Sequence, residues 1–393
     1  MITVIGLDGS PLCGVAQERL AAASLVIGGR RHLREIPLPL GTPALALRDD
    51  PGEAMRQVLE ADGPVVVLAS GDPGFFGVLR LLRERLPADQ VEVLPGLSSV
   101  ALAFARAGLP WDDAVVVSAH GRDPRHAVAA CRAHPKVAVL TSPGAGPAEL
   151  GAALAGVERR MCVVERVGLE GERVTWLTPE AAAAGADWDP LHVVLVVDDA
   201  RAVAGDKGWL AGRVQPAGWA LPEGRFEHRS GMVTKPEVRA LVLARLGPRL
   251  GDMVWDVGAG SGSVAVECAR LGAAVVAIEK DDPSHLEANV KAHGVDVQVV
   301  HGTAPAALDG LPQPDAVFVG GGGLDVVQAI VACRPARLVV ALATLERVVP
   351  VVDALRAWAP EAVLLESKRL LPLGDGSRLV PTNPVFVISG ALT

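Results

Sequence analysis

Residues 256–262 read DVGAGSG, an acid followed by three glycines at alternate positions. The stretch follows the apolar run 253–257 and opens a helix-like run at 263–272, which is the context that a nucleotide-binding loop requires. Glycine allows tight turning and lets a ligand approach the backbone closely. The next apolar run ends in Glu279, where a carboxylate can accept hydrogen bonds from both hydroxyls of a ribose. These residues predict a nucleotide site.

A glycine loop alone does not identify its nucleotide, because NAD, FAD and S-adenosylmethionine sites all use one. Two features favour S-adenosylmethionine. Asp256 precedes the first glycine, and a free carboxylate near the loop suits an ammonium group better than a pyrophosphate. The third strand then runs into HGTAPAAL (301–308), where a turn can meet the adenine edge. NAD binding, and glycines that serve only tight strand–helix packing, remain the alternatives.

The loop after the fourth strand bears on which atom is methylated. Amino-group methylases of this architecture carry Asn/Asp-Pro-Pro-aromatic there, whereas this chain has VGGGG (319–323). Bare backbone suits a bulky, flat substrate and methylation of carbon, although a flexible loop would have the same composition. NPVF (383–386) falls on the last strand, which is the wrong place for the amino-methylating motif.

Two further loops lie in the first half of the chain. ASGDPGFFGVL (69–79) and LPGLSSVALA (94–103) each follow a strand-like run and open a helix-like run. Gly-Asp-Pro-Gly is a tight turn, and turn formation alone would explain either stretch. Their order, together with IGLDGS (5–10) and SAHGR (118–122), is more specific than either loop by itself.

Strand-like and helix-like runs alternate through both halves, so we expect an α/β fold with largely parallel sheets. In the first half, strands are expected at 2–6, 64–70, 91–94, 114–118, 136–142, 161–166 and 192–197, with helices at 78–86 and 98–108. In the second half, a helix at 236–246 precedes strands at 253–257, 274–279, 297–300, 315–320, 337–342, 362–367 and 384–389. Helices should connect the first five, and a loop should join the last two as an antiparallel pair.

Composition narrows the function further. At roughly 150 residues per domain, 393 residues suggest two or three domains, and the net charge of −8 argues against nonspecific nucleic-acid binding. The five cysteines form no CxxC pair, and Cys131 with His134 has no second pair nearby, so neither a disulfide framework nor a metal site is expected. No apolar run approaches the roughly 18 residues of a membrane span, and no basic segment precedes the first strand. A cytoplasmic protein is therefore expected.

The first 200 residues resemble the tetrapyrrole methylases, which methylate ring carbons in corrin and sirohaem synthesis. The similar stretches are IGLDGSP, SGDPGFFG, LPGLSS and SAHGR; the first departs from the commoner G-x-G-P-G loop and resembles the C5-methylating branch. The last 165 residues or so resemble the companion methylase and decarboxylase of the same pathway step, through MVTKPEVRALVL, WDVGAGSGSVAVE, VVHGTAPAAL and NPVFVISG. The resemblance implies a tetrapyrrole-methylase fold of two α/β lobes with a cleft at 1–200, a linker at 201–228 and a seven-stranded Rossmann-like class I methyltransferase at 229–393.

The resemblance also implies two S-adenosylmethionine sites in the chain. In the C-terminal half the matching positions are Thr234, Gly258, Ala259, Gly260, Ser261, Gly262, Glu279, Thr303 and Ala304, with Asp256 just behind them. Relatives often carry Gly-Asp-Ala where this chain has 302–304, so backbone groups would have to replace a side-chain contact to adenine. In the N-terminal half they are Gly71, Asp72, Pro73, Ser98, Ser99 and Thr141. No catalytic residue and no metal ligand is assigned.

The implied activity is methylation of precorrin-6Y at C5 by the N-terminal half, and at C15 by the C-terminal half with decarboxylation of the C12 acetate, to give precorrin-8x in cobalamin biosynthesis. Such a substrate carries many carboxylates, so Arg and Lys should line its site. The candidate substrate contacts are Asp8, His120, Lys235, Arg239 and Arg378, with Arg229, Lys368 and Arg369 as further cations. Lys235 and Arg239, four residues apart beside Thr234, are the preferred pair, although each of these cations could be a solvated surface charge and His120 a structural histidine.

A homo-oligomer is expected from the same resemblance, with no nucleic-acid or membrane partner. Three alternatives stay open: a cobalt-containing substrate, an RNA or protein methyltransferase with an accessory domain, and a non-catalytic S-adenosylmethionine sensor. The acidic balance weighs against the second alternative. No evident effector stretch supports the third.

Overall fold

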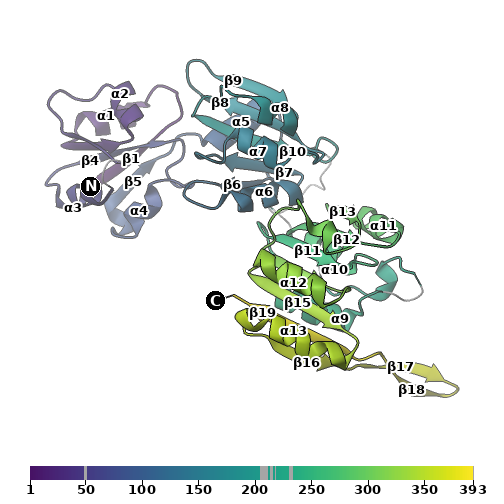
Figure 1. Cartoon of the computed structure of the whole chain (residues 1–393). Coiled ribbons are helices and arrows are strands. Elements are labelled where there is room, and N and C mark those ends of the chain that lie inside the picture. Colours follow the sequence, from purple (N-terminus) through teal and green to yellow (C-terminus); the bar gives the residue numbers. More distant parts are fainter. Residues whose placement is uncertain (48–50, 204–210, 213–215, 217, 230–232, 393) are drawn as a thin grey trace. The chain divides into compact units, whose positions relative to one another are not determined.

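The computed structural model describes residues 1–47, 51–203, 211–212, 216, 218–229 and 233–392. They divide into two compact units, one made of 1–122 with 136–207 and the other of 123–135 with 208–393. Each unit is an α/β structure (Figure 1). Because the α/β alternation is visible in the sequence, this fold class was predictable from periodicity, and it is confirmed.

The first sheet of the first unit is entirely parallel, in the order β3-β2-β4-β1-β5. Its central strands are buried on both faces, which explains their unbroken apolar runs. The strands are β1 Ile2–Leu7, β2 Leu25–Gly28, β3 Ala44–Ala46, β4 Val65–Ser70 and β5 Val91–Leu94. The helices that accompany them are α1 Gly14–Ala21, α2 Arg30–Glu35, α3 Pro51–Glu60, α4 Leu79–Arg83 and the 3-10 turn η1 Ala88–Gln90.

The second sheet of this unit departs from the expected parallel arrangement. Its order is β6-β7-β10-β8-β9, and only the β6–β7 ladder is parallel. The strands are β6 Val115–Ser118, β7 Lys136–Leu140, β8 Arg160–Glu165, β9 Arg173–Leu177 and β10 His192–Val197, with helices α5 Ser99–Ala107, α7 Pro147–Ala153 and α8 Pro179–Ala184. The short segment between β8 and β9 holds no helix, so these two strands pair antiparallel. Strands β2, β3 and β9 escaped sequence prediction.

The second unit contains the seven-stranded sheet that the sequence predicts, in the order β13-β12-β11-β14-β15-β19-β16. The strands are β11 Met253–Val257, β12 Ala274–Glu279, β13 Gln298–His301, β14 Ala316–Val319, β15 Arg337–Leu342, β16 Glu361–Leu365 and β19 Val385–Ala391. The first five are parallel, and β19 runs antiparallel to both β15 and β16, as expected for the last two strands.

The helices of the second unit are α6 Pro124–Ala133, α9 Pro236–Leu246, α10 Ser263–Arg270, α11 Ser284–Ala292, α12 Leu324–Cys333 and α13 Val348–Ala354. Short 3-10 turns lie at η2 Glu223–Arg225, η3 Ala306–Leu308, η4 Leu345–Arg347 and η5 Arg356–Trp358. The expectation that a helix connects each of the first five strands is wrong at one place. Between β13 and β14 the chain forms only the short turn η3.

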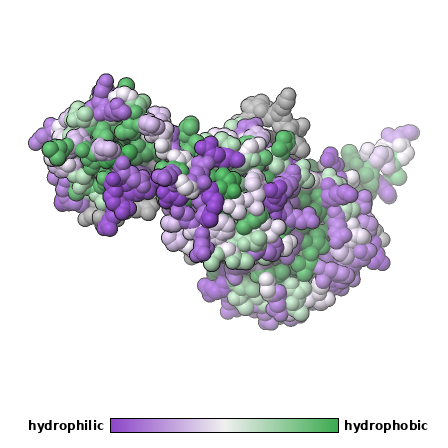
Figure 2. All heavy atoms as spheres, turned by 90° about the horizontal axis from the view of Figure 1, so that it is seen from above, coloured by the Kyte–Doolittle hydropathy of each residue, from purple (hydrophilic) through white to green (hydrophobic). Residues whose placement is uncertain are grey.

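A β-hairpin interrupts the connection between β16 and β19, where only a loop was expected. Strands β17 Lys368–Leu373 and β18 Gly376–Pro381 pair antiparallel and project away from the seven-stranded sheet (Figure 1). Four leucines on the hairpin are exposed: Leu370, Leu371, Leu373 and Leu379. Figure 2 shows apolar side chains on the surface of this arm.

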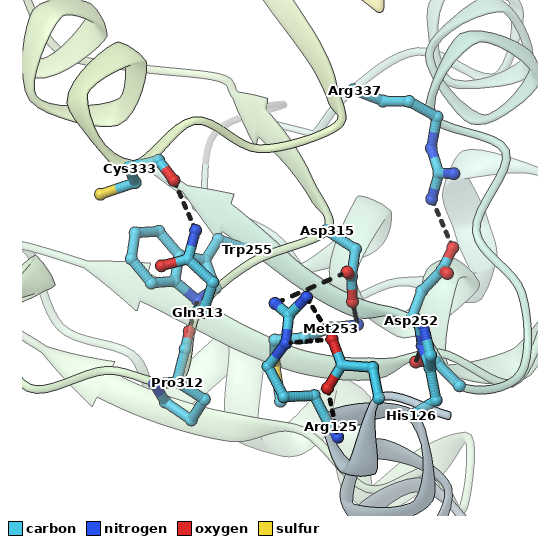
Figure 3. A network of polar contacts seen from close by, with 12 residues as sticks. Arg125, His126, Asp252, Met253, Trp255, Pro312, Gln313, Asp315, Cys333 and Arg337 are labelled. Atoms are coloured by element: carbon cyan, nitrogen blue, oxygen red, sulfur yellow. Dashed lines mark hydrogen bonds and ion pairs between the residues drawn. The ribbon is translucent and has the colours of Figure 1, made fainter. Parts of the chain in front are cut away.

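The amino ends of β11, β14 and β15 are joined by a polar network at the sheet edge opposite the glycine loop (Figure 3). Met253 N donates to Asp315 Oδ2 at 2.8 Å, and Arg337 forms an ion pair with Asp252. His126 Nδ1 donates to the carbonyl of Gly251 at 2.8 Å. This network fixes the register of the strands, and their carboxyl ends are left to build a site.

No helix among the described residues is long and apolar enough to cross a membrane. The same residues contain no cluster of three or more His, Cys, Asp or Glu side chains that could hold a metal ion.

Candidate functional site

The glycine loop of the second unit lies where the strand order of the sheet reverses. β11 is flanked by β12 on one side and β14 on the other, and all three are parallel, so their following loops meet at one edge. Ligands of open α/β sheets bind in the crevice outside the carboxyl ends of the strands at such a point. The loop at 258–262 therefore occupies the position that a nucleotide site requires.

Two of the glycines are required by close packing of the loop. A Cβ on Gly258 would lie 2.8 Å from the backbone N of Gly321, so the loop after β11 packs directly against the loop after β14. Gly262 caps helix α10 with φ +71°, and a Cβ there would lie 2.8 Å from Leu286 Cγ. The loop is thus compact and bare, which fits the close approach of a nucleotide.

Glu279 lies at the carboxyl end of β12 and faces the glycine loop. Its Oε2 accepts a hydrogen bond from Gly260 N at 2.7 Å, and its Oε1 accepts one from Asp281 N at 2.9 Å. The side chain is 7% exposed, so the carboxylate is held at the edge of the crevice. This placement is compatible with the ribose contact that the sequence predicts.

Asp256 is placed behind the loop and not on its surface. The residue is 1% exposed, its Oδ2 accepts from Ala265 N at 2.9 Å, and its Oδ1 has no hydrogen-bond partner among the described residues. Burial raises the pKa of this carboxyl to about 7, the bond from Ala265 opposes the rise, and the nearby charge of Glu279 adds to it. The expected free carboxylate beside an ammonium group is therefore wrong for Asp256, which instead joins the end of β11 to helix α10.

The preferred substrate pair, Lys235 and Arg239, is also corrected. Lys235 is half-buried and its Nζ pairs with Glu223 at 2.6 Å. Arg239 is fully buried and its Nε donates to Glu267 Oε1 at 2.7 Å, with its remaining nitrogens bonded to the carbonyls of Thr234 and Leu221. Their i, i+4 spacing does not bring them to a common surface, because α9 turns Arg239 into the interior.

The other predicted positions of this half are distributed around the same sheet edge or outside it. Thr303 is exposed and Ala304 half-buried, both just after β13 and next to Gly302, whose N donates to Glu279 O at 2.9 Å. Arg378 and Lys368 are exposed on the hairpin, and Arg369 pairs with Glu223 and Glu237. Arg229 lies just before residues outside the described part of the chain.

A surface beside the glycine loop was missed by sequence reasoning. Arg347, in the turn after β15, is exposed and donates from Nη1 to the carbonyl of Gly322 at 3.2 Å. Leu345 and Val349 flank it and are 64% and 66% exposed. Apolar side chains and a cation next to the bare loop 320–323 suit a flat substrate with carboxylates. The residue types at this surface are ordinary, so no motif marks it. The only signal in the sequence is its position directly after strand β15.

In the first unit, the loops after three adjacent parallel strands meet in the same way. A Cβ on Gly6 would lie 2.1 Å from Gly71 O and 2.3 Å from Gly96 N, so the end of β1 packs backbone to backbone against the loops after β4 and β5. Asp8 Oδ2 accepts from Leu97 N at 2.9 Å and thereby ties the first loop to the third. Partial burial opposes ionisation of Asp8, but the bonds from Ser10 and Leu97 outweigh it and lower its pKa.

The remaining predicted residues of this half lie at strand ends. Gly71 has φ +57°, and Asp72 Oδ1 accepts from Gly74 N at 2.8 Å, which closes a turn around buried Pro73. Ser98 caps α5 by accepting from Ala101 N at 3.1 Å, and Ser99 begins that helix. Thr141 is buried and donates to His192 O at 2.9 Å, while His120 is exposed in the turn after β6.

Both units carry similarity to methyltransferases. A family profile described as Tetrapyrrole (Corrin/Porphyrin) Methylases matches residues 14–183, and one described as Precorrin methyltransferase domain matches residues 225–390. The fold and the two profile matches thus define a chain of two methyltransferase domains. Such a chain uses S-adenosylmethionine, in keeping with the glycine loop and Glu279.

A relative of similar length identifies the family. The chain is 36% identical over 98% of its length to a precorrin-6Y C(5,15)-methyltransferase [decarboxylating] of Sinorhizobium sp, of which it covers 94%. It therefore belongs to the precorrin-6Y C(5,15)-methyltransferase (decarboxylating) family, an enzyme family of cobalamin biosynthesis.

Two shorter relatives each match part of the chain. A cobalt-precorrin-7 C(5)-methyltransferase of Salmonella typhimurium is 32% identical over 51% of this chain and 100% of its own length. A probable cobalt-precorrin-6B C(15)-methyltransferase (decarboxylating) of Pyrobaculum calidifontis is 38% identical over 43% of this chain and 94% of its own length.

Proposed function

We propose that this protein methylates precorrin-6Y at C5 and C15 and removes carbon dioxide from the C12 acetate, giving precorrin-8x. The observation that carries the proposal is the 36% identity over 98% of the chain to the family member that bears this activity in its name. The presence of a bare, strand-end loop cluster in each unit supports it.

Two cofactor sites per chain are part of the proposal. Gly258–Gly262, Glu279, Thr234, Thr303 and Ala304 would hold S-adenosylmethionine in the second unit, and Gly71–Pro73, Ser98, Ser99 and Thr141 in the first. A Cβ on Gly258 in the second unit or on Gly71 in the first would meet backbone, which fits a ligand bound against bare main chain. When bound, the cofactor supplies an electrophilic methyl group.

We assign the two methylations to different domains. Residues 1–200 would methylate C5, 201–228 would connect the domains, and 229–393 would methylate C15 and decarboxylate. The half-length relatives support this division, because one is named for C5 and the other for C15 with decarboxylation.

The chain's own residues would act mainly by positioning the substrate against the cofactor and by excluding water. The macrocycle offers electron-rich carbons and can accept the electrons released by decarboxylation, so no strong protein base is required. Bare backbone at 320–323 leaves room for a flat ring, while Arg347 offers a cation for one carboxylate. Asp8, His120 and Arg378 remain proposed substrate contacts, each at the surface or beside a loop.

The division of labour is tested with two full-length variants. Gly6→Val would put a Cβ 2.1 Å from Gly71 O, and Gly258→Val would put one 2.8 Å from Gly321 N. Each substitution should therefore distort the loop cluster of its own unit. With precorrin-6Y and S-adenosylmethionine, we expect Gly6→Val to add one methyl group and release carbon dioxide. We expect Gly258→Val to release none, as measured by mass spectrometry of the product.

The control is Gly14→Ala, at the exposed start of α1, where a Cβ meets nothing within 4 Å and the backbone is not left-handed. It should retain both methylations. Carbon dioxide release by Gly258→Val but not by Gly6→Val would reverse the assignment.

The cobalt-containing equivalent is the second candidate substrate, because both half-length relatives are named for cobalt-precorrins. Turnover of precorrin-6Y with and without inserted cobalt decides between them. We also propose that the protein is a homo-oligomer and acts in the cytoplasm.

A further inference from the structure

We propose that residues 220–228, which the sequence places in a linker, form a strap that belongs to the C-terminal cofactor site, with Asn289 as its positioning residue. The strap would act on the glycine loop at 258–262, so its effect on cofactor rests on the proposed function of that loop. Asn289 lies on helix α11. In the sequence it is only a polar residue on an otherwise apolar face of that helix.

One amide joins the strap to the glycine loop. Asn289 is 1% exposed, and its Nδ2 donates to the carbonyls of Ser261 and Glu227, both at 2.8 Å. Its Oδ1 accepts from Glu227 N at 2.7 Å. Both donors and the acceptor are therefore used, and a buried amide satisfied in this way specifies a single arrangement of the groups that it connects.

The bond to Ser261 bears directly on the cofactor loop. Ser261 is buried within the loop, and Gly262 N donates to Ala259 O at 2.8 Å to close its turn. On the other side, Gly260 N donates to Glu279 Oε2 at 2.7 Å. Glu279 and Asn289 thus hold two successive residues of the loop, and together they set which backbone groups face the crevice.

The beginning of the strap is bound to the helix that follows the loop. Ala220 N and Leu221 N donate to the two carboxylate oxygens of Glu267 on α10, at 2.7 and 2.8 Å. Glu267 is fully buried and also accepts from Arg239 Nε at 2.7 Å. Because Arg239 holds the carbonyls of Thr234 and Leu221 as well, the strap, the predicted cofactor position Thr234 and α10 form one network.

The strap is also packed along its length. Phe226 is 5% exposed and lies against Val233 and Val266. The Arg239 guanidinium carbon lies 4.7 Å from the centroid of the Phe226 ring, and His293 stacks on that ring at 5.0 Å. These contacts are those of a domain core, and a spacer between domains would not need them.

Two matched pairs of variants of the full chain test the proposal. Asn289→Asp keeps the shape and the acceptor but removes both donors, and its control is Lys291→Ala on the exposed face of the same helix. Glu227→Pro removes the N–H that Asn289 accepts. Its control is Glu227→Ala, because the Glu227 side chain is 69% exposed and Asn289 uses only the backbone of this residue.

The variants are titrated calorimetrically with S-adenosylhomocysteine, which binds without turnover. For the wild type we expect two binding events per chain. Asn289→Asp and Glu227→Pro should weaken one of them at least tenfold and leave the other unchanged, while Lys291→Ala and Glu227→Ala match the wild type. The unaffected event reports that the chain is folded.

A strap of purely structural importance would lower the melting temperature without changing either affinity, and that result overturns the proposal. Equal weakening of both events also overturns it, because the effect would then be global. A single wild-type event would contradict two cofactor sites; the strap is then supported if Asn289→Asp weakens that event and overturned if it does not. If Asn289→Asp fails to fold, the Glu227 pair alone gives the same decision.

Discussion

Asp256 carries the strongest electrostatic consequence at the scale of single residues. Its carboxyl is fully buried under the glycine loop, and burial raises its pKa from 3.8 to about 7. Between these two values the native state keeps a proton that the unfolded chain has released. The contribution of Asp256 to stability is therefore fully present below about pH 4 and is lost as the pH rises through about 7.

We expect the free energy of unfolding to fall with pH in that window, by up to about 1.4 kcal/mol per pH unit from this one group. Asp256→Asn cannot ionise, so the variant should lack this slope. Urea unfolding of the wild type and of Asp256→Asn between pH 5 and 8 measures this slope. Asp282→Asn, at an exposed position, is the control. Parallel curves for wild type and Asp256→Asn would contradict the raised pKa.

Arg347 is the second residue that can be tested alone. It stands exposed beside the bare loop 320–323, where a substrate carboxylate would lie. Arg347→Ala should raise KM for the tetrapyrrole about tenfold to a hundredfold, as expected for the loss of a hydrogen bond to a charged group. Arg356→Ala, an exposed change on the following turn, is the control. The idea fails if steady-state kinetics show KM unchanged.

At the scale of elements, the packing of α9 on α10 depends on a fully buried ion pair. Removing one partner of such a pair leaves an uncompensated charge in the interior. Arg239→Met should lower the free energy of unfolding by about 3–5 kcal/mol. Arg239→Met with Glu267→Gln should recover part of the loss because the charge is gone. Chemical unfolding of both variants measures this, and a double variant no better than the single one would argue against the charge as the cause.

The β17–β18 hairpin is the element that bears on the homo-oligomer. Leu370 and Leu379 are paired across the two strands and are 67% and 62% exposed. Exposed apolar side chains on a projecting arm favour contact with a second copy of the chain. Leu370→Asp with Leu379→Asp should lower the mass measured by analytical ultracentrifugation, while Val203→Asp, an exposed change elsewhere, should not. An unchanged mass would remove the hairpin from the interface.

At the scale of the whole molecule, each candidate site is formed inside one unit. A chain damaged at one site should therefore keep the activity of the other site. An equal mixture of Gly6→Val and Gly258→Val should then give the doubly methylated, decarboxylated product. Mass spectrometry of the mixed reaction measures it against each variant alone. No doubly methylated product from the mixture would mean that the intermediate cannot pass between chains.

Much of the fold could be predicted from periodicity. β11, β12, β15 and α9 have the bounds that the apolar runs indicate, because long regular runs encode their own structure. The β17–β18 hairpin and strands β2, β3 and β9 could not be predicted in this way. They are short or exposed, and their pairing partners, not their own pattern, decide them.

For the candidate sites, local sequence determined the loops and tertiary packing decided the side chains. DVGAGSG and SGDPG could be recognised because a tight turn at the end of a strand restricts its residues to a few types. No local pattern reveals that Asp256 is buried, that Arg239 points into the interior or that Asn289 joins a supposed linker to the glycine loop. Those facts depend on which helix face meets the sheet, and contacts between residues far apart in the chain set that orientation.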